Sequence, residues 1–182
     1  YRANTPDRCY VCKGHYLGEL LTYAQAHGFN FLVDGSNVDD LGDHRPGQRA
    51  ARERGVRSPL QEAGLTKAEI RTLARQRGFP NWDKPSAACL ASRIPYGTPV
   101  TAETLAQIER AEETLHELGF RQARVRYHGA VARLELEAAD LARALELREA
   151  IDAGVRAAGF TYVALDLAGF RSGSLNLALA MT

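Results

Sequence analysis

The carboxyl-terminal half of the chain has the clearest alternation of apolar and polar positions. Apolar residues recur every three or four positions from 105 to 118, behind a Thr101 that can cap a helix, and predict a helix that ends at Gly119. Two alternating runs follow, Ala123–Tyr127 and Ala130–Glu137, and predict a β-hairpin.

A second helical pattern runs from Asp140 to Gly159, and a third strand is predicted at Tyr162–Leu167. The order helix, strand, strand, helix, strand is typical of a small antiparallel sheet with two helices on one face. We therefore expect an α+β domain in this half of the chain.

The amino-terminal half is less regular. A helical pattern after Cys12 ends at Gly28, and the apolar run Phe29–Val33 predicts a buried strand with a polar exit loop. In open α/β sheets, ligands bind at such strand ends. Thr66 and Glu69 have the spacing of a capping box. The helix that they begin is expected to point Ile70, Leu73 and Ala74 inward. Because the composition changes after the central loop, we expect one domain at residues 1–97 and a second at 98–182.

Charge and cysteine content limit the classes of protein. The 182 residues carry 23 Lys and Arg against 22 Asp and Glu, a net charge of +1. This balance gives no basic field of the kind that nucleic-acid-binding proteins use, so we expect no nucleic-acid partner. No apolar run is long enough for a membrane span. Three cysteines, an odd number, are typical of a reducing compartment, so we expect a cytoplasmic protein. We also expect the protein to form homo-oligomers.

The stretch WDKPSAACLASRIPYG, from Trp82 to Gly97, places Cys89 among small residues. Its prolines favour extended backbone, which predicts a shaped loop rather than a long helix. Small neighbours leave a thiol accessible, and Arg93 would favour the thiolate, the nucleophilic form. Two interpretations stay open: a catalytic Cys89 assisted by Arg93, or a cysteine buried as a small apolar side chain.

Cys9 and Cys12 form a C-x-x-C pair near the start of the first predicted helix. Such a pair suits a redox dithiol or half of a zinc site, and a coincidence of spacing explains it as well. No second Cys or Cys/His pair completes a zinc site. With Cys89 there are three thiolates, which suit an iron–sulfur cluster that keeps one iron open for another ligand. We therefore favour a metal or cluster site over a redox dithiol.

Arginines form a second group of candidates. Arg124 and Arg126 alternate along one strand and so share a face, and Arg171 lies in the glycine-flanked segment GFRSG. Guanidinium groups bind phosphate or carboxylate bidentately, and glycine lets the backbone approach an anion closely. The alternative is a solvated strand face that makes weak surface ion pairs.

Carboxylates are the last candidates. Glu112 and Glu135 suit an acid, a base or a cation ligand, but solvated surface positions explain them as well. Aspartates near the exit of the predicted strand could hold Mg²⁺ through water, although loop solubility explains them equally well. These aspartates are Asp34, Asp39, Asp40 and Asp43.

Five segments, spread between Asn4 and Gly173, read NTPDRCYVCK, DGSNVDDLGDHRPG, GLTKAEIRTLARQRGFPNWDKPSAACLASRIPYG, RVRYHGAVARLELE and LDLAGFRSG. They resemble the LarE family of ATP-dependent sulfur transferases, and the resemblance covers essentially the whole chain. The resemblance implies a member of the PP-loop ATP pyrophosphatase superfamily. It also implies an α/β fold, the carboxyl-terminal part of an adenine-nucleotide alpha hydrolase-like domain, followed by the small α+β domain.

The resemblance implies a role in making the nickel-pincer nucleotide cofactor of lactate racemase. ATP, with Mg²⁺, adenylylates a carboxylate of a pyridinium mononucleotide, and sulfur delivered at Cys89 gives a thiocarboxylate. Family members with a single cysteine give up its sulfur and keep dehydroalanine. Members with three cysteines hold a [4Fe-4S] cluster whose open iron carries a sulfide. Cys9, Cys12 and Cys89 resemble the second group.

The resemblance also implies roles for single residues. The positions that bind the substrate phosphate match Arg124, Arg126 and Arg171. Glu112 and Glu135 fall near carboxylates to which the resemblance gives a metal role. The family's SGGxDS phosphate loop is expected before Tyr1, so most of the ATP site should lie outside this chain. The alternatives are a tRNA thiolation enzyme of the same superfamily and a non-enzymatic module that binds a metal or cluster.

Overall fold

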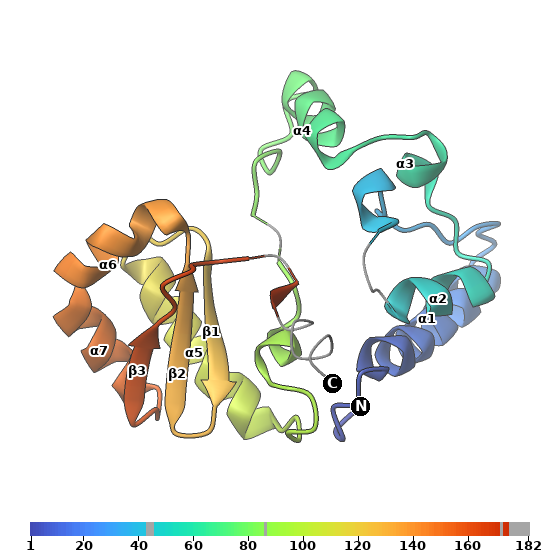
Figure 1. The fold of residues 1–182 in the computed structure, drawn as a ribbon. Coiled ribbons are helices and arrows are strands. Elements are labelled where there is room, and N and C mark those ends of the chain that lie inside the picture. Colours follow the sequence, from blue (N-terminus) through green and yellow to red (C-terminus); the bar gives the residue numbers. More distant parts are fainter. Residues whose placement is uncertain (43–45, 86, 172, 175–182) are drawn as a thin grey trace. The chain divides into compact units, whose positions relative to one another are not determined.

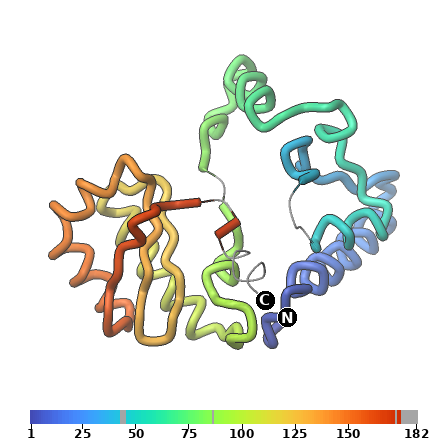
Figure 2. The backbone as a smooth tube through the Cα atoms, viewed as in Figure 1, coloured from blue at the N-terminus to red at the C-terminus, as the bar shows by residue number. Residues whose placement is uncertain are grey.

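The computed structural model describes residues 1–42, 46–85, 87–171 and 173–174 (Figure 1). The chain packs as two compact units, and Figure 2 traces the path of its backbone. Unit 1 comprises Tyr1 and Thr5–Lys84, and unit 2 comprises Arg2–Asn4 and the chain from Pro85 onward. The division into domains at residues 97 and 98 stays a prediction.

Unit 1 is helical. Its elements are α1 (Arg8–Ala26), the 3₁₀ turn η1 (Val38–Asp40), α2 (Pro46–Glu53), α3 (Pro59–Glu62) and α4 (Lys67–Gln76). Helices α1 and α2 pack against each other, and Leu17, Ala51 and Val56 form a small core. Among the described residues, no helix combines the length and the apolar composition that a bilayer span requires.

The segment from Phe29 to Val33 is not the buried strand that its apolar run predicts. Only Val33 makes a bridge, a parallel one with Arg57. Phe29 and Phe31 are 62% and 68% exposed. A strand is buried only when neighbouring elements cover its edges and faces. Among the described residues of unit 1, only Arg57 pairs with this segment. The sequence pattern therefore identified extended backbone but not its environment.

Helix α4 begins at the predicted capping box. The Thr66 N–H donates to Glu69 Oε2 at 2.8 Å, and the Glu69 N–H donates to Thr66 Oγ1 at 3.3 Å. The prediction of an inward face was wrong for the described part of the chain, where α4 has no buried residue. A capping box needs only local bonds, whereas burial needs a neighbouring layer.

Unit 2 contains the α+β arrangement expected from the sequence (Figure 1). Its elements are the 3₁₀ turn η2 (Leu90–Arg93), α5 (Ala102–Glu117), β1 (Ala123–His128), β2 (Val131–Leu136), the 3₁₀ turn η3 (Ala138–Asp140), α6 (Leu141–Glu146), α7 (Arg148–Ala157) and β3 (Tyr162–Leu165). The single long helix predicted from Asp140 to Gly159 is thus two shorter helices.

The sheet has the order β1-β2-β3 and is mixed rather than antiparallel. Strands β1 and β2 form the predicted hairpin, but β3 pairs with β2 in parallel. The prediction of an all-antiparallel sheet was wrong because the helical crossover through α6 and α7 returns the chain to the end of the sheet where β2 began.

Helices α5 and α7 pack on the sheet and on each other. The core between them includes Ile108, Leu115, Val125 and Val155. Helix α7 approaches α5 closely at Gly154, where an added Cβ would lie 2.3 Å from the Thr114 methyl carbon. This face of the sheet is therefore a packed core, and the polar side chains of β1 and β2 point to the opposite face.

Candidate active site

Cys89 precedes the turn η2 and is exposed. The backbone is extended at Cys89, and the Ser92 N–H donates to the Cys89 carbonyl at 2.9 Å, which closes the turn. The interpretation of Cys89 as a buried apolar side chain is therefore wrong. Ser86, in the same loop, lies outside the described residues.

Arg93 lies at the end of this turn, and its guanidinium is buried. Its Nη1 donates to the carbonyls of Ala88 and Cys89 at 2.9 and 3.3 Å and to Ser92 Oγ at 3.0 Å. Its Nε and Nη2 donate to the two carboxylate oxygens of Glu112 at 2.7 and 2.8 Å. Arg93 thus contacts the backbone of the cysteine turn. Its role in catalysis stays a prediction.

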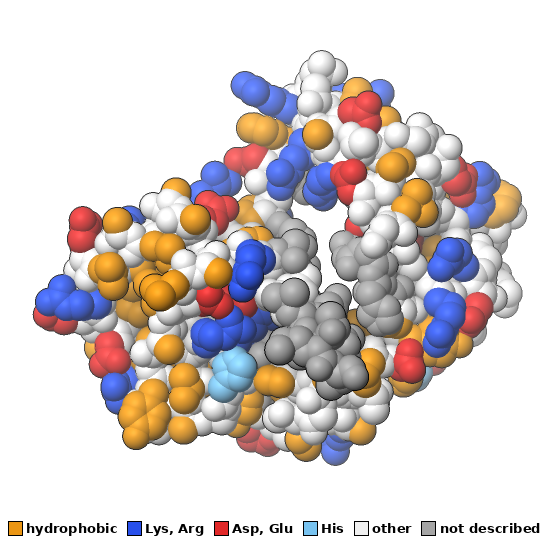
Figure 3. Space-filling view, viewed as in Figure 1, with side chains coloured by type: hydrophobic (Ala, Val, Ile, Leu, Met, Phe, Trp, Pro, Cys, Tyr) orange, Lys and Arg blue, Asp and Glu red, His pale blue; other side chains and the backbone are white. Residues whose placement is uncertain are grey.

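The outer face of the hairpin carries alternating charged residues. The strand register pairs Arg124 with Glu135 and Arg126 with Arg133, so all four side chains share one face. Figure 3 shows basic and acidic side chains gathered together on unit 2. The prediction that Arg124 and Arg126 share a face is confirmed. Both are buried rather than solvated.

Arg126 is held by several acceptors. Its Nη2 donates to Glu135 Oε2 at 2.7 Å and to Ser174 Oγ at 2.6 Å. Its Nη1 donates to the Ser92 carbonyl at 2.7 Å, which ties β1 to the cysteine turn. Arg133 approaches Glu135 Oε1 at 3.1 Å and also pairs with Asp166. Glu135 therefore lies between two guanidinium groups, and its own side chain is 1% exposed.

Arg124 is different. It is buried, and no hydrogen bond joins its side chain to another described residue, whereas Arg126 lacks a partner only at its Nε. Its guanidinium carbon lies 4.5 Å from the centre of the Phe170 ring. Burial, together with the nearby guanidinium groups of Arg93 and Arg126, lowers the pKa of Arg124 to about 10, so it stays protonated at neutral pH.

Arg171 follows Phe170 in the segment after β3 and is exposed. The Phe170 N–H donates to the Leu136 carbonyl at 2.6 Å, and the Gly169 N–H donates to the Asp166 carbonyl at 3.0 Å. Gly169 has a φ of +67°, and a Cβ there would lie 2.8 Å from the Leu136 carbonyl oxygen. A glycine is therefore required at the turn that brings Phe170 to Arg124.

The carboxylates of Glu112 and Glu135 both accept hydrogen bonds from arginine side chains. Glu112 Oε1 also accepts the Val125 N–H at 2.9 Å. Within the described ranges, the structure contains no group of three or more His, Cys, Asp or Glu side chains placed to hold a metal ion. Metal binding by Glu112 and Glu135 stays a prediction.

Cys9 and Cys12 lie in the first turns of α1 in unit 1 and are exposed. This agrees with the predicted position near a helix amino terminus. Cys89 belongs to unit 2. The three cysteines therefore come from both units, and a cluster held by all three stays a prediction.

The aspartates after Val33 organise loops of unit 1. Asp34 accepts from Lys13 Nζ at 3.0 Å and from Ser58 Oγ at 2.7 Å. Asp39 accepts the Lys67 N–H, and Asp40 accepts the Asn37 N–H. Asp43 lies outside the described residues. These hydrogen bonds organise the loops of unit 1, and Mg²⁺ binding by the aspartates stays a prediction.

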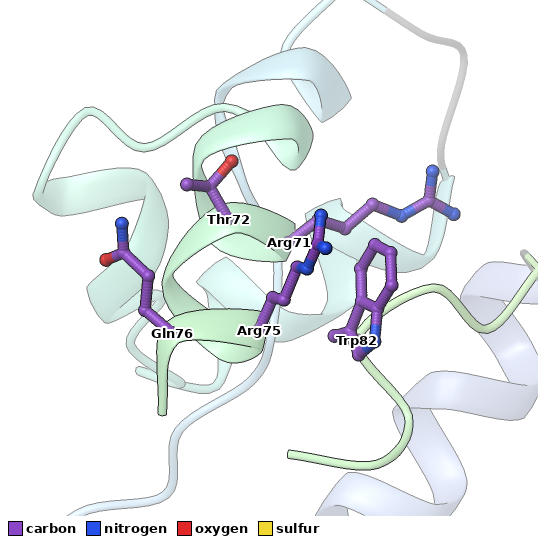
Figure 4. Close-up of a pocket in the computed structure, with 5 residues that line it drawn as sticks. All are labelled: Arg71, Thr72, Arg75, Gln76 and Trp82. Atoms are coloured by element: carbon purple, nitrogen blue, oxygen red, sulfur yellow. The ribbon is translucent and has the colours of Figure 1, made fainter. Parts of the chain in front are cut away.

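A shallow cavity of about 480 Å³ lies beside α4 (Figure 4). Arg75 and Trp82 are stacked, with the guanidinium carbon 5.0 Å from the centre of the ring. Arg71 Nη2 donates to the Lys84 carbonyl at 3.2 Å. These two contacts hold the start of the Trp82–Gly97 stretch against α4.

Sequence reasoning missed several residues of the site in unit 2. These are Ser92, Arg133, Asp166, Phe170 and Ser174. Arg133 was recoverable, because the alternation within the second hairpin strand places it on the face of Glu135. The contacts of Ser92, Phe170 and Ser174 join segments far apart in the sequence, and no local pattern signals them.

Several known proteins are similar to nearly the whole chain, although no family model matches it. The chain is 44% identical to the uncharacterized protein slr1717 of Synechocystis, over 98% of the chain and 68% of that protein. It is 41% identical to pyridinium-3,5-bisthiocarboxylic acid mononucleotide synthase of Lactiplantibacillus plantarum, over 95% of the chain and 63% of that protein. It is 31% identical to the uncharacterized protein MJ0830 of Methanocaldococcus jannaschii, over 93% of the chain and 66% of that protein. The chain thus spans from 63% to 68% of the length of these relatives.

Proposed function

Since the chain belongs to the LarE family, we propose that its protein is an ATP-dependent sulfur transferase that acts on a pyridinium mononucleotide. One relative is named as the synthase of a pyridinium bisthiocarboxylic acid mononucleotide. The chain spans about two thirds of these relatives, so ATP and Mg²⁺ use is proposed for the whole protein. The product would serve the nickel-pincer cofactor of lactate racemase.

The proposed reaction replaces one carboxylate oxygen of the substrate with sulfur. ATP adenylylates the carboxylate and releases pyrophosphate, which makes AMP the leaving group. Sulfur then attacks the acyl carbon and AMP departs. Cys89 is the proposed point of sulfur delivery, because its thiol is exposed on a turn tied to the arginine-bearing face of the sheet.

The observation that carries the proposal is the buried Arg124. A buried cation without an acceptor is costly, and a bound phosphate would supply the acceptors that the described residues do not. Arg126 has acceptors already and would contribute mainly positive charge. Arg171 is exposed and can supply a second guanidinium fork to the same phosphate.

Two sources of sulfur are compatible with this site. In the first, the Cys89 thiolate displaces AMP to form a thioester, and loss of the Cα proton with cleavage of the Cβ–Sγ bond leaves a thiocarboxylate and dehydroalanine. In the second, Cys9, Cys12 and Cys89 hold a [4Fe-4S] cluster. All three thiols are exposed, and a C-x-x-C pair with a third thiolate is a ligand pattern that such clusters use. A bound cluster would supply sulfide at its open iron.

The test uses the full-length protein with ATP, Mg²⁺ and the carboxylated pyridinium mononucleotide, and measures thiocarboxylate by mass spectrometry. We expect product from the wild type and none from Cys89→Ser. A Cys9→Ser/Cys12→Ser variant should be inactive if the cluster delivers sulfur and active if Cys89 gives up its own. Intact mass after turnover should show loss of the elements of H₂S only if Cys89 gives up its own sulfur.

Other results would contradict the proposal. Product formed by Cys89→Ser would place the sulfur carrier elsewhere. Sulfur found in tRNA rather than in the mononucleotide would favour a tRNA thiolation enzyme. A bound cluster without product from the full-length protein would leave a binding module.

A further inference from the structure

The turn that carries Cys89 is too short to be stable alone. Turn η2 has four residues, and backbone hydrogen bonds run from the Ser92 N–H to the Cys89 carbonyl and from the Ile94 N–H to the Ala91 carbonyl. Short 3₁₀ turns have weak hydrogen-bond geometry and depend on their surroundings. The position of the thiol is therefore set by what holds the turn.

Arg93 holds the turn from inside. One edge of its guanidinium donates to the Ala88 and Cys89 carbonyls and to Ser92 Oγ, so it spans both ends of the turn. Its other edge forms a bidentate pair with Glu112. Both side chains are at most 8% exposed. A buried bidentate pair of this kind fixes direction as well as distance.

Glu112 connects the turn to the strand that carries the phosphate arginines. The same oxygen, Oε1, accepts from Arg93 Nε at 2.7 Å and from the Val125 N–H at 2.9 Å. Val125 lies between Arg124 and Arg126 in β1. Glu112 itself lies on α5 beside the core residues Ile108 and Leu115, so its backbone is held by packing. One carboxylate oxygen thus fixes the position of the turn after Cys89 relative to β1.

We infer that Arg93 and Glu112 are positioning residues that fix the Cys89 turn relative to Arg124 and Arg126. This inference rests on the proposed function, in which sulfur from Cys89 must reach a carboxylate whose phosphate lies on these arginines. Arg93 acts through the carbonyls of the turn rather than on the sulfur. Glu112 acts through Arg93 and Val125 rather than through a metal ion. Small displacements of a reacting group cost large factors in rate.

The experiment compares Arg93→Gln, Glu112→Gln and the double variant in the full-length protein. Removing one partner leaves a buried charge unpaired, whereas the double amide variant leaves none. Asp152→Asn is the matched control, because it removes the same charge from the exposed pair that Asp152 forms with Arg156 at 2.7 Å in unit 2. Thermal unfolding identifies any single variant that does not fold. In that case the double variant, which leaves no buried charge unpaired, tests the inference.

Two readouts are measured. Amide hydrogen exchange of the peptide from Ala88 to Ile94 should be about 10-fold faster in both single variants and in the double variant, and unchanged in Asp152→Asn. Thiocarboxylate formation at saturating substrate should be at least about 10-fold slower, with the substrate concentration at half-maximal rate changed less than about 3-fold. The double variant should be no slower than either single one, because both residues act through one contact.

Unchanged exchange in the turn would overturn the inference. So would a Glu112→Gln variant that transfers sulfur at the wild-type rate while Arg93→Gln does not, since Arg93 would then act on the sulfur. Slow transfer by Glu112→Gln with an unchanged turn, restored by added divalent cation, would instead assign Glu112 to a metal. If the wild type makes no thiocarboxylate, the proposed function fails, while hydrogen exchange still decides whether Arg93 and Glu112 hold the turn.

Discussion

The guanidinium carbon of Arg124 lies 4.5 Å from the centre of the Phe170 ring, and no hydrogen bond joins its side chain to another described residue. Stacking on an aromatic ring stabilises a desolvated guanidinium, but by less than paired hydrogen bonds to an anion. Arg124 is thus a buried, protonated guanidinium that is available to bind an anion. The neighbouring Arg126, on the same face, has its acceptors built in.

The first prediction concerns the Arg124→Gln variant. The concentration of mononucleotide at half-maximal rate should rise about 10- to 100-fold, because charge-assisted hydrogen bonds to the phosphate are lost. The free energy of unfolding should not fall, because the substitution removes a buried cation. Initial rates and thermal unfolding check the two effects. Arg148→Gln, at an exposed position in unit 2, is the control and should change neither.

The second prediction concerns inorganic phosphate. A ligand that binds only the folded state stabilises it, by about 2.7 kcal/mol at a concentration 100 times its dissociation constant. Phosphate should therefore raise the unfolding temperature of the wild type above that in chloride of equal ionic strength. The rise should disappear in Arg124→Gln. An equal rise in both proteins would place the phosphate elsewhere.

The third prediction compares two glycines with positive φ. In Gly169→Ala the new methyl group meets the Leu136 carbonyl oxygen at 2.8 Å, whereas in Gly173→Ala no atom of the described residues lies within 4 Å of it. Both variants carry the backbone strain of a positive φ, about 1 kcal/mol. Only Gly169→Ala should also displace Phe170, so it should lose more stability and raise the substrate concentration at half-maximal rate. Equal effects of the two variants would refute this role for Gly169.

The sequence predicted unit 2 well where the signals are local. Thr101 caps α5 as expected, and the turn at Gly129 joins β1 and β2 within one residue of the predicted bounds. The parallel pairing of β3 escaped prediction because it depends on the path of the crossover rather than on alternation within the strand. Local pattern gives elements and faces, and pairing is a property of the whole unit.

For the candidate site, the sequence identified residues but not their partners. Cys89 and Arg124 were selected by residue type and spacing. That Arg93 contacts the cysteine backbone, and that Glu112 holds Arg93, follows from contacts between residues 19 apart in the chain. The exposure of Phe29 and Phe31 shows the same limit, because an apolar run does not state what covers it.

The last prediction concerns Asp34. Burial alone would raise its pKa, but hydrogen bonds from Ser58, Lys13 and Ser36 outweigh burial and lower the pKa to about 2. Because the pKa is lower in the folded state, the carboxylate stabilises unit 1 above the unfolded pKa near 4, and this stabilisation is lost as the pH falls through 2. A ¹³C titration of the Asp34 carboxyl should therefore show a midpoint near pH 2.

The Asp34→Asn variant tests the same interactions through stability. At pH 6 it should be less stable than the wild type by about 1 to 2 kcal/mol, a value that allows for partial solvent exposure of the Lys13 pair. The difference should shrink from pH 4 downward, since the Asp34 carboxyl of the unfolded wild type becomes protonated near pH 4 and that of the folded wild type near pH 2. Asp152→Asn serves as the control for an exposed pair and should show little loss at either pH. A difference that stayed constant between pH 6 and pH 2 would mean that the shape of the Asp34 side chain, rather than its charge, holds the loop after Val33 to α1.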